Sequence, residues 1–305
     1  MISPIYFLIG LFFVSKNSEG QLETIFKQKD SVSISRVVAL GTGVGLGSAA
    51  SLYIINKNWY SNYQRVPFHF FNDNKDWLFM DKAGHALSSY YGGYYGYNAC
   101  KWAGVSEKKS ILIGGMYGFS FLLITETMDG FSSTWGASTG DVIANGIGST
   151  LFSVQQLLIK NQVFTPKFSY WPTQFAQYRP NVLGDNHWNR WLKDYNGQIY
   201  WLSFSLADLK VSESYFPKWL SLAVGYSGDG MLGGSENPQF NEQGVLLPEF
   251  DRNPEFFLSL DINFQNIQTK SKLLNTCIKG LSFIKIPFSS ISLKGSKVSF
   301  NPLTY

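Results

Sequence analysis

The chain carries little charge and little cysteine for its length. Of its 305 residues only 15% are charged, whereas 45% are hydrophobic and 17% are aromatic. Disordered tails and nucleic-acid-binding arms have fewer apolar residues and many more charged ones, so this composition excludes both. We therefore expect no nucleic acid as a partner. The formal net charge of +4 is small and spread along the chain, and it indicates no anionic partner. The length allows one large domain or two modest ones.

The two cysteines, Cys100 and Cys277, fit neither the spacing of a metal site nor a framework of several disulfides. A single disulfide stays open as an alternative, and we expect buried free thiols. In contrast, the chain is rich in aromatic residues and glycine: it contains 25 Phe, 17 Tyr, 9 Trp and 29 Gly. Many aromatic and small residues with few charges are typical of a protein that lies at or in a membrane.

The amino terminus predicts an export signal. Residues 5–14 form an apolar run, IYFLIGLFFV, which is shorter than the roughly 20 residues of a membrane-spanning helix. Small residues follow at Ser18 and Gly20, so we expect a signal peptide at residues 1–20 with cleavage before Gln21. A short anchor or a buried segment is the alternative. No cysteine lies near this site to carry a lipid. The protein is therefore expected in the cell envelope, in the periplasm facing a membrane.

Four weakly charged segments predict helices, at residues 37–56, 83–99, 110–125 and 142–159. Small residues recur in them at intervals of four, which places these residues along one helix face. Such faces let membrane helices approach closely, whereas each glycine costs a soluble helix about 1 kcal/mol relative to alanine. We therefore expect a membrane-associated bundle. The alternative is a glycine-rich soluble bundle, with a strand at residues 41–47. The small residues are Gly41, Gly45 and Ala49; Gly84, Ser88, Gly92 and Gly96; Gly114 and Gly118; and Gly140, Ala144 and Gly148.

The polar residues of these helical segments gather at the segment ends. They come in pairs three or four residues apart, which share a helix face. If consecutive helices are antiparallel, all the pairs lie at the same end of the bundle. Carboxylates and one imidazole placed together suit a divalent metal ion or a general acid/base pair. The pairs are Asp81 and His85, Glu126 and Asp129, and Asp141 and Asn145.

This cluster is the candidate site. It would hold one divalent metal ion, whose identity the sequence leaves open. The candidate ligands are Asp81, His85, Glu126, Asp129 and Asp141; the candidate catalytic residues are His85, Glu126 and Asp129; Lys82 and Asn145 are expected as structural polar partners.

Each of these residues also has a purely structural interpretation, because buried polar groups are usually just paired. Ser138 and Asp141 fit a helix-capping box in which the Asp141 carboxylate reaches back to the cap. Asp81 could cap the second helix while Lys82 pairs with Glu126. His85 could be a paired histidine of the core.

The same residues carry a resemblance to a known family. Over about residues 55–160 the chain resembles the YfiM-like periplasmic lipoproteins of Gram-negative envelopes, and the remainder resembles a long variant of that family. The resemblance implies an envelope location and no defined activity, and the chain lacks the family's lipobox cysteine. The motifs are Trp59-Tyr60, Phe68-His69-Phe70-Phe71-Asn72-Asp73, Asp81-Lys82-x-x-His85, Glu126-x-x-Asp129-Gly130-Phe131-Ser132 and Gly140-Asp141-x-x-x-Asn145-x-x-Gly148. The charged elements also resemble VanZ-like membrane proteins, although Asp129 stands where those have glutamine.

From about residue 164 the pattern changes from helical to extended. Apolar and polar residues alternate over 256–264, which predicts a strand, and 200–206, 283–288 and 297–300 are further candidates. We expect turns at Asn196-Gly197 and at Gly228-Asp229-Gly230, and a short helix beginning at Pro217. The strands are too few for a closed outer-membrane barrel, which needs about eight or more. A small antiparallel sheet against the helices, or against a partner, is predicted instead.

The sequence thus predicts an α+β protein with a signal peptide at 1–20, a glycine-rich helical domain at 21–163 and an α+β region at 164–305. We favour a non-enzymatic envelope component, such as an accessory subunit of a membrane-protein complex, because no nucleophile elbow or metallohydrolase motif is recognised. The alternative is a membrane-embedded hydrolase or transferase that acts on a lipid-linked or phosphorylated substrate, with His85 or Glu126 as the acid/base. The expected partners are membrane lipid, with the outer membrane preferred, and other envelope membrane proteins.

Overall fold

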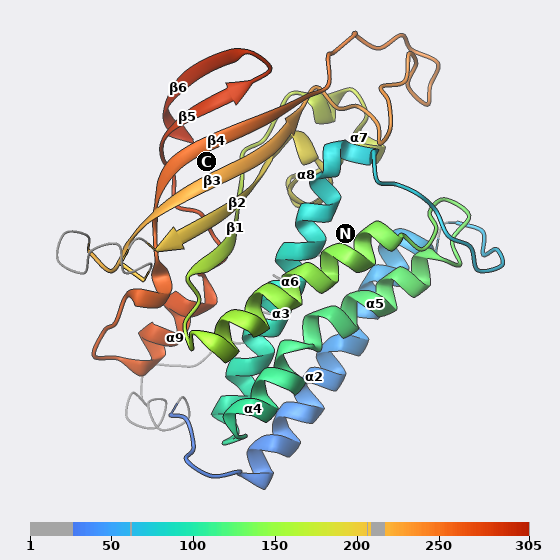
Figure 1. The fold of residues 1–305 in the computed structure, drawn as a ribbon. Helices are drawn as coiled ribbons and strands as arrows, with labels where there is room; N and C mark the ends of the chain where they lie inside the picture. The colour runs from blue at the N-terminus through green and yellow to red at the C-terminus, as the bar shows by residue number, and fades with distance from the viewer. Residues whose placement is uncertain (1–26, 62, 206, 209–216, 305) are drawn as a thin grey trace.

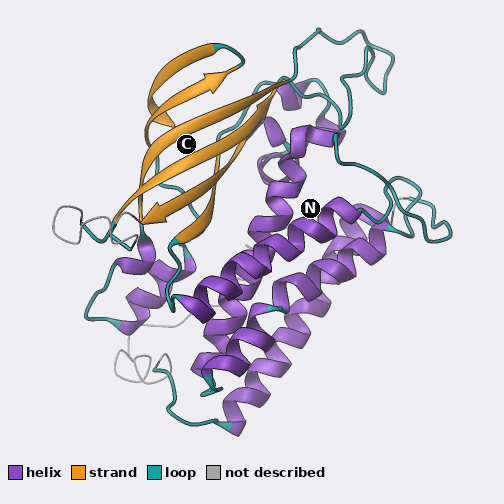
Figure 2. Cartoon of the chain, in the orientation of Figure 1, coloured by secondary structure: helices purple, strands orange, loops and turns teal. Residues whose placement is uncertain are grey.

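A helical bundle and an antiparallel sheet make up the structure, a computed structural model that describes residues 27–61, 63–205, 207–208 and 217–304. The expected signal peptide lies outside these residues. The predicted α+β class is confirmed: Figures 1 and 2 show the long helices on one side of the molecule and the sheet on the other.

Long helices form the bundle, and the predicted helical segments fall on them and on the π-helical turns that continue them. The alternative of a strand at residues 41–47 is wrong, because those residues lie within a helix. The elements are α2 (Ile34–Ile55) with a π-helical turn at Asn56–Tyr60, α3 (Met80–Trp102), α4 (Glu107–Lys109) with a π-helical turn at Ser110–Gly114, α5 (Tyr117–Asp129) and α6 (Thr139–Leu158).

Glycines let helix α3 pack against the segment that contains α5 with their backbones in contact. A Cβ atom built on Gly96 would lie 2.4 Å from the carbonyl oxygen of Gly114, and one on Gly92 would lie 2.4 Å from the Cα of Gly118. The small-residue spacing therefore does predict close packing here. In α2 it does not: a Cβ atom on Gly41 or Gly45 would meet no atom within 4 Å.

Six strands of the described chain form one antiparallel sheet in which each strand pairs with the next. The helix expected from Pro217 is wrong, because a strand that the sequence did not predict begins at Leu220. That strand continues to Asp229, so the turn expected there begins later. The strands are β1 (Phe164–Tyr170), β2 (Gln198–Ser205), β3 (Leu220–Asp229), β4 (Asn253–Ile262), β5 (Phe288–Lys294) and β6 (Lys297–Thr304). The short helices are α7 (Pro180–Leu183), α8 (His187–Lys193) and α9 (Lys272–Gly280).

The sheet curls until the chain that enters β5 meets β1. Residues 283–285, predicted as part of a strand, make only an isolated bridge to β1. The N–H of Phe168 donates to the carbonyl of Phe283 at 2.7 Å, and the N–H of Lys285 donates back to the carbonyl of Phe168 at 2.9 Å. One face of the sheet is thereby enclosed.

The enclosed face carries buried charge beside an apolar cluster of Ile199, Trp201, Ala223 and Phe257. Asp261 and Lys167 form an ion pair with a nitrogen–oxygen distance of 2.6 Å, and Lys285 lies 4.0 Å from the other oxygen of Asp261. All three side chains are at least 98% buried. The ammonium of Lys285 also lies 4.9 Å from the centre of the Trp201 ring. Burial lowers the pKa of Lys285 to about 8, since the interior disfavours the second cation.

Aromatic residues join the sheet to the helices. Tyr90, Tyr91 and Tyr94 of α3 form one core cluster with Phe152 of α6 and Phe168 of β1. Aromatic side chains bury much apolar area, and the tyrosine hydroxyls find partners at the boundary. The hydroxyl of Tyr91, for instance, donates to the carbonyl of Pro166 in β1 at 2.8 Å.

A left-handed turn leads into α3. Trp77, Leu78 and Phe79 have φ angles of 49°, 51° and 63°, which cost about 1–2 kcal/mol per residue without glycine. The carboxy-terminal region holds this turn from outside. The N–H of Trp77 donates to the carbonyl of Gly234 at 2.8 Å, and the Tyr226 hydroxyl donates to the carbonyl of Leu78 at 2.6 Å.

Both cysteines are free thiols, as expected. Cys100 is buried at the end of α3, whereas Cys277 on α9 is partly exposed. The alternative of a single disulfide is therefore wrong for this structure.

The glycine contact between α3 and the α5 segment can be tested by adding one methyl group. We expect Gly114→Ala to lower the free energy of unfolding by about 1–3 kcal/mol, because the backbone of Gly96 occupies the space that the methyl needs. Gly41→Ala is the matched control and should be neutral or stabilising by up to about 1 kcal/mol, through helix propensity. Thermal unfolding in detergent, followed by circular dichroism, measures both. Equal melting temperatures for the two variants would contradict this packing.

Replacing the buried anion and replacing one buried cation of the sheet should have opposite effects on stability. Asp261→Asn leaves two buried ammonium groups without their shared anion and should cost about 3–5 kcal/mol of stability. Lys285→Met leaves a one-to-one ion pair and should be neutral or stabilising, since an apolar side chain replaces a surplus buried charge. Denaturant unfolding of both variants beside the wild type makes the comparison. A larger loss in Lys285→Met than in Asp261→Asn would overturn this assignment of charges.

Candidate metal centre

Three helix ends meet at the candidate site: the start of α3, the end of α5 and the start of α6. Ser138 caps α6 as expected, and its Oγ accepts the N–H of Asp141 at 3.1 Å. The other half of the predicted capping box is wrong. The N–H of Ser138 donates to Oε2 of Glu126 at 3.2 Å, so a carboxylate of α5 takes the place expected for Asp141. This bond ties the end of α5 to the start of α6.

Lys82 is the cation at the centre of an acidic group. Its Nζ lies 2.5 Å from Asp73, 2.8 Å from Asp81 and 3.0 Å from Asp141. Burial alone would lower the pKa of Lys82, but Asp81 and Asp141 raise it above its ordinary value. The expected pairing of Lys82 with Glu126 is wrong, because these three aspartates surround the ammonium. The three aspartates therefore already share one cation. Their carboxylate oxygens also lie close enough together to hold a metal ion.

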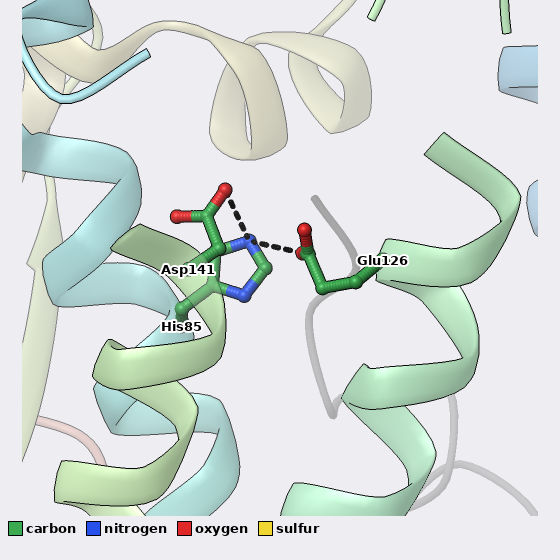
Figure 3. A group of neighbouring side chains, drawn as sticks. All are labelled: His85, Glu126 and Asp141. Carbon is green, nitrogen blue, oxygen red and sulfur yellow. Dashed lines mark ion pairs between the residues drawn. The ribbon is translucent and has the colours of Figure 1, made fainter. Parts of the chain in front are cut away.

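His85 faces a second pair of carboxylates across a gap. Its Nε2 lies 3.7 Å from Oε1 of Glu126 and 3.8 Å from Oδ2 of Asp141, and Figure 3 shows both carboxylates directed at this nitrogen. The ligand atoms of the three residues all lie within 4.8 Å of one another. These distances are too long for hydrogen bonds. The three groups converge without bonding each other.

The other ring nitrogen of His85 fixes the tautomer. Nδ1 lies 3.0 Å from Oδ1 of Asn145, and because an amide oxygen can only accept, Nδ1 carries the proton. Burial lowers the pKa of His85 to about 4, so the ring is neutral near pH 7. Nε2 therefore presents a lone pair to two carboxylates. A histidine held in this way has the tautomer of a metal ligand, oriented by a hydrogen bond behind it.

Glu126 leaves one oxygen without a partner. Its side chain is only 3% exposed, and no described residue donates a hydrogen bond to Oε1. Burial raises the pKa of the neighbouring Asp141 to about 6. A lone pair and two oxygens crowded together in a buried site repel one another unless a proton or a cation lies between them. A proton on Glu126 or a cation between the three groups would each remove this repulsion, so the geometry makes this group a candidate cation site.

Two residues of the sequence-derived set lie outside this group. Asp81 contacts Lys82 instead. Asp129 is one turn removed and accepts a hydrogen bond from the Tyr60 hydroxyl at 2.7 Å. Among the described residues, the structure thus brings together His85, Glu126 and Asp141, with Asn145 supporting the imidazole.

Sequence reasoning missed Tyr60 and Asp73. Asp73 accepts a hydrogen bond from the hydroxyl of Ser138 at 2.6 Å as well as contacting Lys82. It lies in a loop, where no helical period predicts the direction of a side chain. Both residues belong to the motifs that carry the family resemblance, so that resemblance was the signal that could have found them.

The helical region also matches a known family. Residues 69–157 match DUF2279, a family described as predicted periplasmic lipoproteins. The matched stretch contains every residue of the two charged groups and ends before β1. The description of that family is consistent with an exported protein of the cell envelope. No curated protein and no solved structure matches the chain.

Removing the Lys82 ammonium tests its central position. We expect Lys82→Met to cost about 3–5 kcal/mol of stability, because three carboxylates would be left facing each other in a buried site. Lys101→Met is the matched control: its ion pair with Glu107 is partly exposed, so the loss should be at most about 1 kcal/mol. Denaturant unfolding in detergent gives both values. Similar small losses in the two variants would contradict a central role for Lys82.

Proposed function

We propose that this protein is a non-enzymatic, membrane-associated component of the cell envelope, whose helix ends are joined by a divalent metal ion. The ion would bind Nε2 of His85, Oε1 of Glu126 and Oδ2 of Asp141. One observation carries the proposal: an imidazole lone pair and an unpartnered, buried carboxylate oxygen point into the same gap.

The size of the gap supports a metal ion. Metal–ligand bonds of about 2.0–2.1 Å in tetrahedral geometry separate ligand atoms by about 3.3 Å. The two separations from Nε2 of His85, 3.7 and 3.8 Å, need to shrink by only a few tenths of an ångström, and the two carboxylate oxygens lie within 4.8 Å of each other. One imidazole with two carboxylates and no thiolate suits zinc or manganese among the common divalent ions.

The enclosure of the site favours a structural role for the ion. The three side chains are between 3% and 12% exposed, so little room is open to a substrate. A metal ion here would connect α3, α5 and α6, and its binding free energy would add to the stability of the folded bundle. Such a bundle could serve as an accessory subunit for other membrane proteins of the envelope.

The outer surface of the bundle supports membrane association. Two stretches are long and apolar enough to cross a membrane, Ile34–Ile55 and Glu107–Asp129, with mean hydropathies of 1.6 and 1.4. Only 6% of the first stretch is buried. On α6, Ile143, Ile147 and Leu158 are each more than half exposed. Apolar surface of this extent is stable against lipid or another apolar surface.

Metal content tests the proposed centre directly. We expect one equivalent of a divalent metal in full-length protein purified in detergent without chelators, and its loss in His85→Ala and in Glu126→Gln. His187→Ala, which changes an exposed histidine at the start of α8, should retain the metal. Elemental analysis measures the content, and a chelator should lower the melting temperature of the wild type but not that of His85→Ala.

Two results would contradict the proposal. One is a wild type that neither contains a metal nor melts higher when zinc or manganese is added. The other is hydrolysis of a phosphorylated or lipid-linked substrate that disappears in a folded His85→Ala variant, which would favour the enzyme instead.

A further inference from the structure

We infer that the outer face of the curled sheet contacts the hydrocarbon of a lipid bilayer. This inference rests on the membrane association proposed above and extends it from the helices to the carboxy-terminal region, which lies outside the matched family stretch.

The outer face consists of apolar rows that cross the strands. The strand register aligns Leu202, Val224, Leu258, Ile291 and Phe300 in one such row. All five side chains are at least 36% exposed. The flanking rows are also uncharged: Phe256, Leu293 and Val298 on one side, and Phe204, Leu222 and Leu260 on the other. Tyr200 and Tyr226 continue the first of these rows, but they pack toward the helices. We call the five residues of the first row and the six residues of the flanking rows, eleven in all without the two tyrosines, the outer apolar face.

The enclosed face has the opposite character. The next row inward contains Ser203, Ala223, Ser259 and Ser290, which are all buried. Beside it lie the buried charges of Lys167, Asp261 and Lys285. An antiparallel sheet in water ordinarily directs its apolar residues to the core and its polar residues to the solvent. In this sheet the exposed face is apolar, whereas the enclosed face holds serines and buried charges beside an apolar cluster of Ile199, Trp201, Ala223 and Phe257. An apolar exposed face is expected where the surroundings are apolar.

The distribution of apolar surface favours a bilayer over a single partner. Exposed apolar side chains also lie on α2 and α5, for example Leu46 and Leu123, across the molecule from β4 and β5 (Figure 1). One protein partner covers one side of a molecule, whereas a bilayer contacts all sides at the same depth. A headgroup or a charged partner would require charge on the surface it meets, and the outer apolar face contains none.

Spin labels can test the inference residue by residue. In a background of Cys100→Ala and Cys277→Ser, the full-length chain would carry one label at position 258 or 291 of the outer apolar face. A label at position 147 on α6 reports the membrane association of the helices separately, and one at exposed Gln243 is the aqueous control. The proteins would be reconstituted into phosphatidylcholine vesicles. Collisions with oxygen and with a water-soluble nickel complex would then be compared.

We expect labels at 258 and 291 to collide severalfold more with oxygen relative to nickel than the label at 243 does. Lipid exposure at 147 together with water exposure at 258 and 291 would overturn the inference and leave membrane association intact. Water exposure at all three positions would overturn both. Labels at 258 or 291 that are shielded from both reagents, or that couple to each other in a second copy, would assign the face to a protein interface and so overturn the inference too.

Discussion

The ammonium of Lys82 is the interaction on which the helical region depends. It draws together aspartates from a loop, from α3 and from α6, in a place where none of them could remain buried and charged alone. Asp141 is one of the three, and its second oxygen faces His85. Lys82 thus determines the position of a carboxylate in the neighbouring group, and the geometry of the proposed metal site follows from a charge that is not part of it.

Both halves of the molecule follow the same principle, in which charge is collected inside and apolar side chains are left outside. In the helices the inner charge is the group around Lys82, and near it the backbones of α3 and α6 approach closely at Ala86 and Gly148. In the sheet the inner charge is the cluster around Asp261. The two clusters carry opposite excess charge: three carboxylates surround one ammonium in the helices, whereas two ammonium groups share one carboxylate in the sheet.

The sequence predicted the helices and their approach better than the sheet. Glycine at intervals of four costs a helix stability unless it permits a close approach, and this spacing predicted the contact at Gly92 and Gly118. The same spacing did not predict the packing of α2, because a glycine pattern does not show whether a second helix lies against it. Alternation over 256–264 predicted strand β4 but not which face is enclosed, since that depends on the surroundings. Strand β3 was missed because Pro217 was interpreted as the start of a helix, and Asp73 because loops have no period.

The left-handed turn at Trp77–Phe79 has a consequence for the order in which the protein assembles. Its three strained residues are held by Gly234 and Tyr226, and the contact with Tyr226 spans 148 positions of the chain. Asp81 and Lys82 follow the turn directly. During synthesis the helical region emerges first, but the residues that hold the entry of α3 emerge only after β2. A chain truncated after the matched family stretch would therefore contain every charged residue of the site and lack the contacts that keep the start of α3 in place.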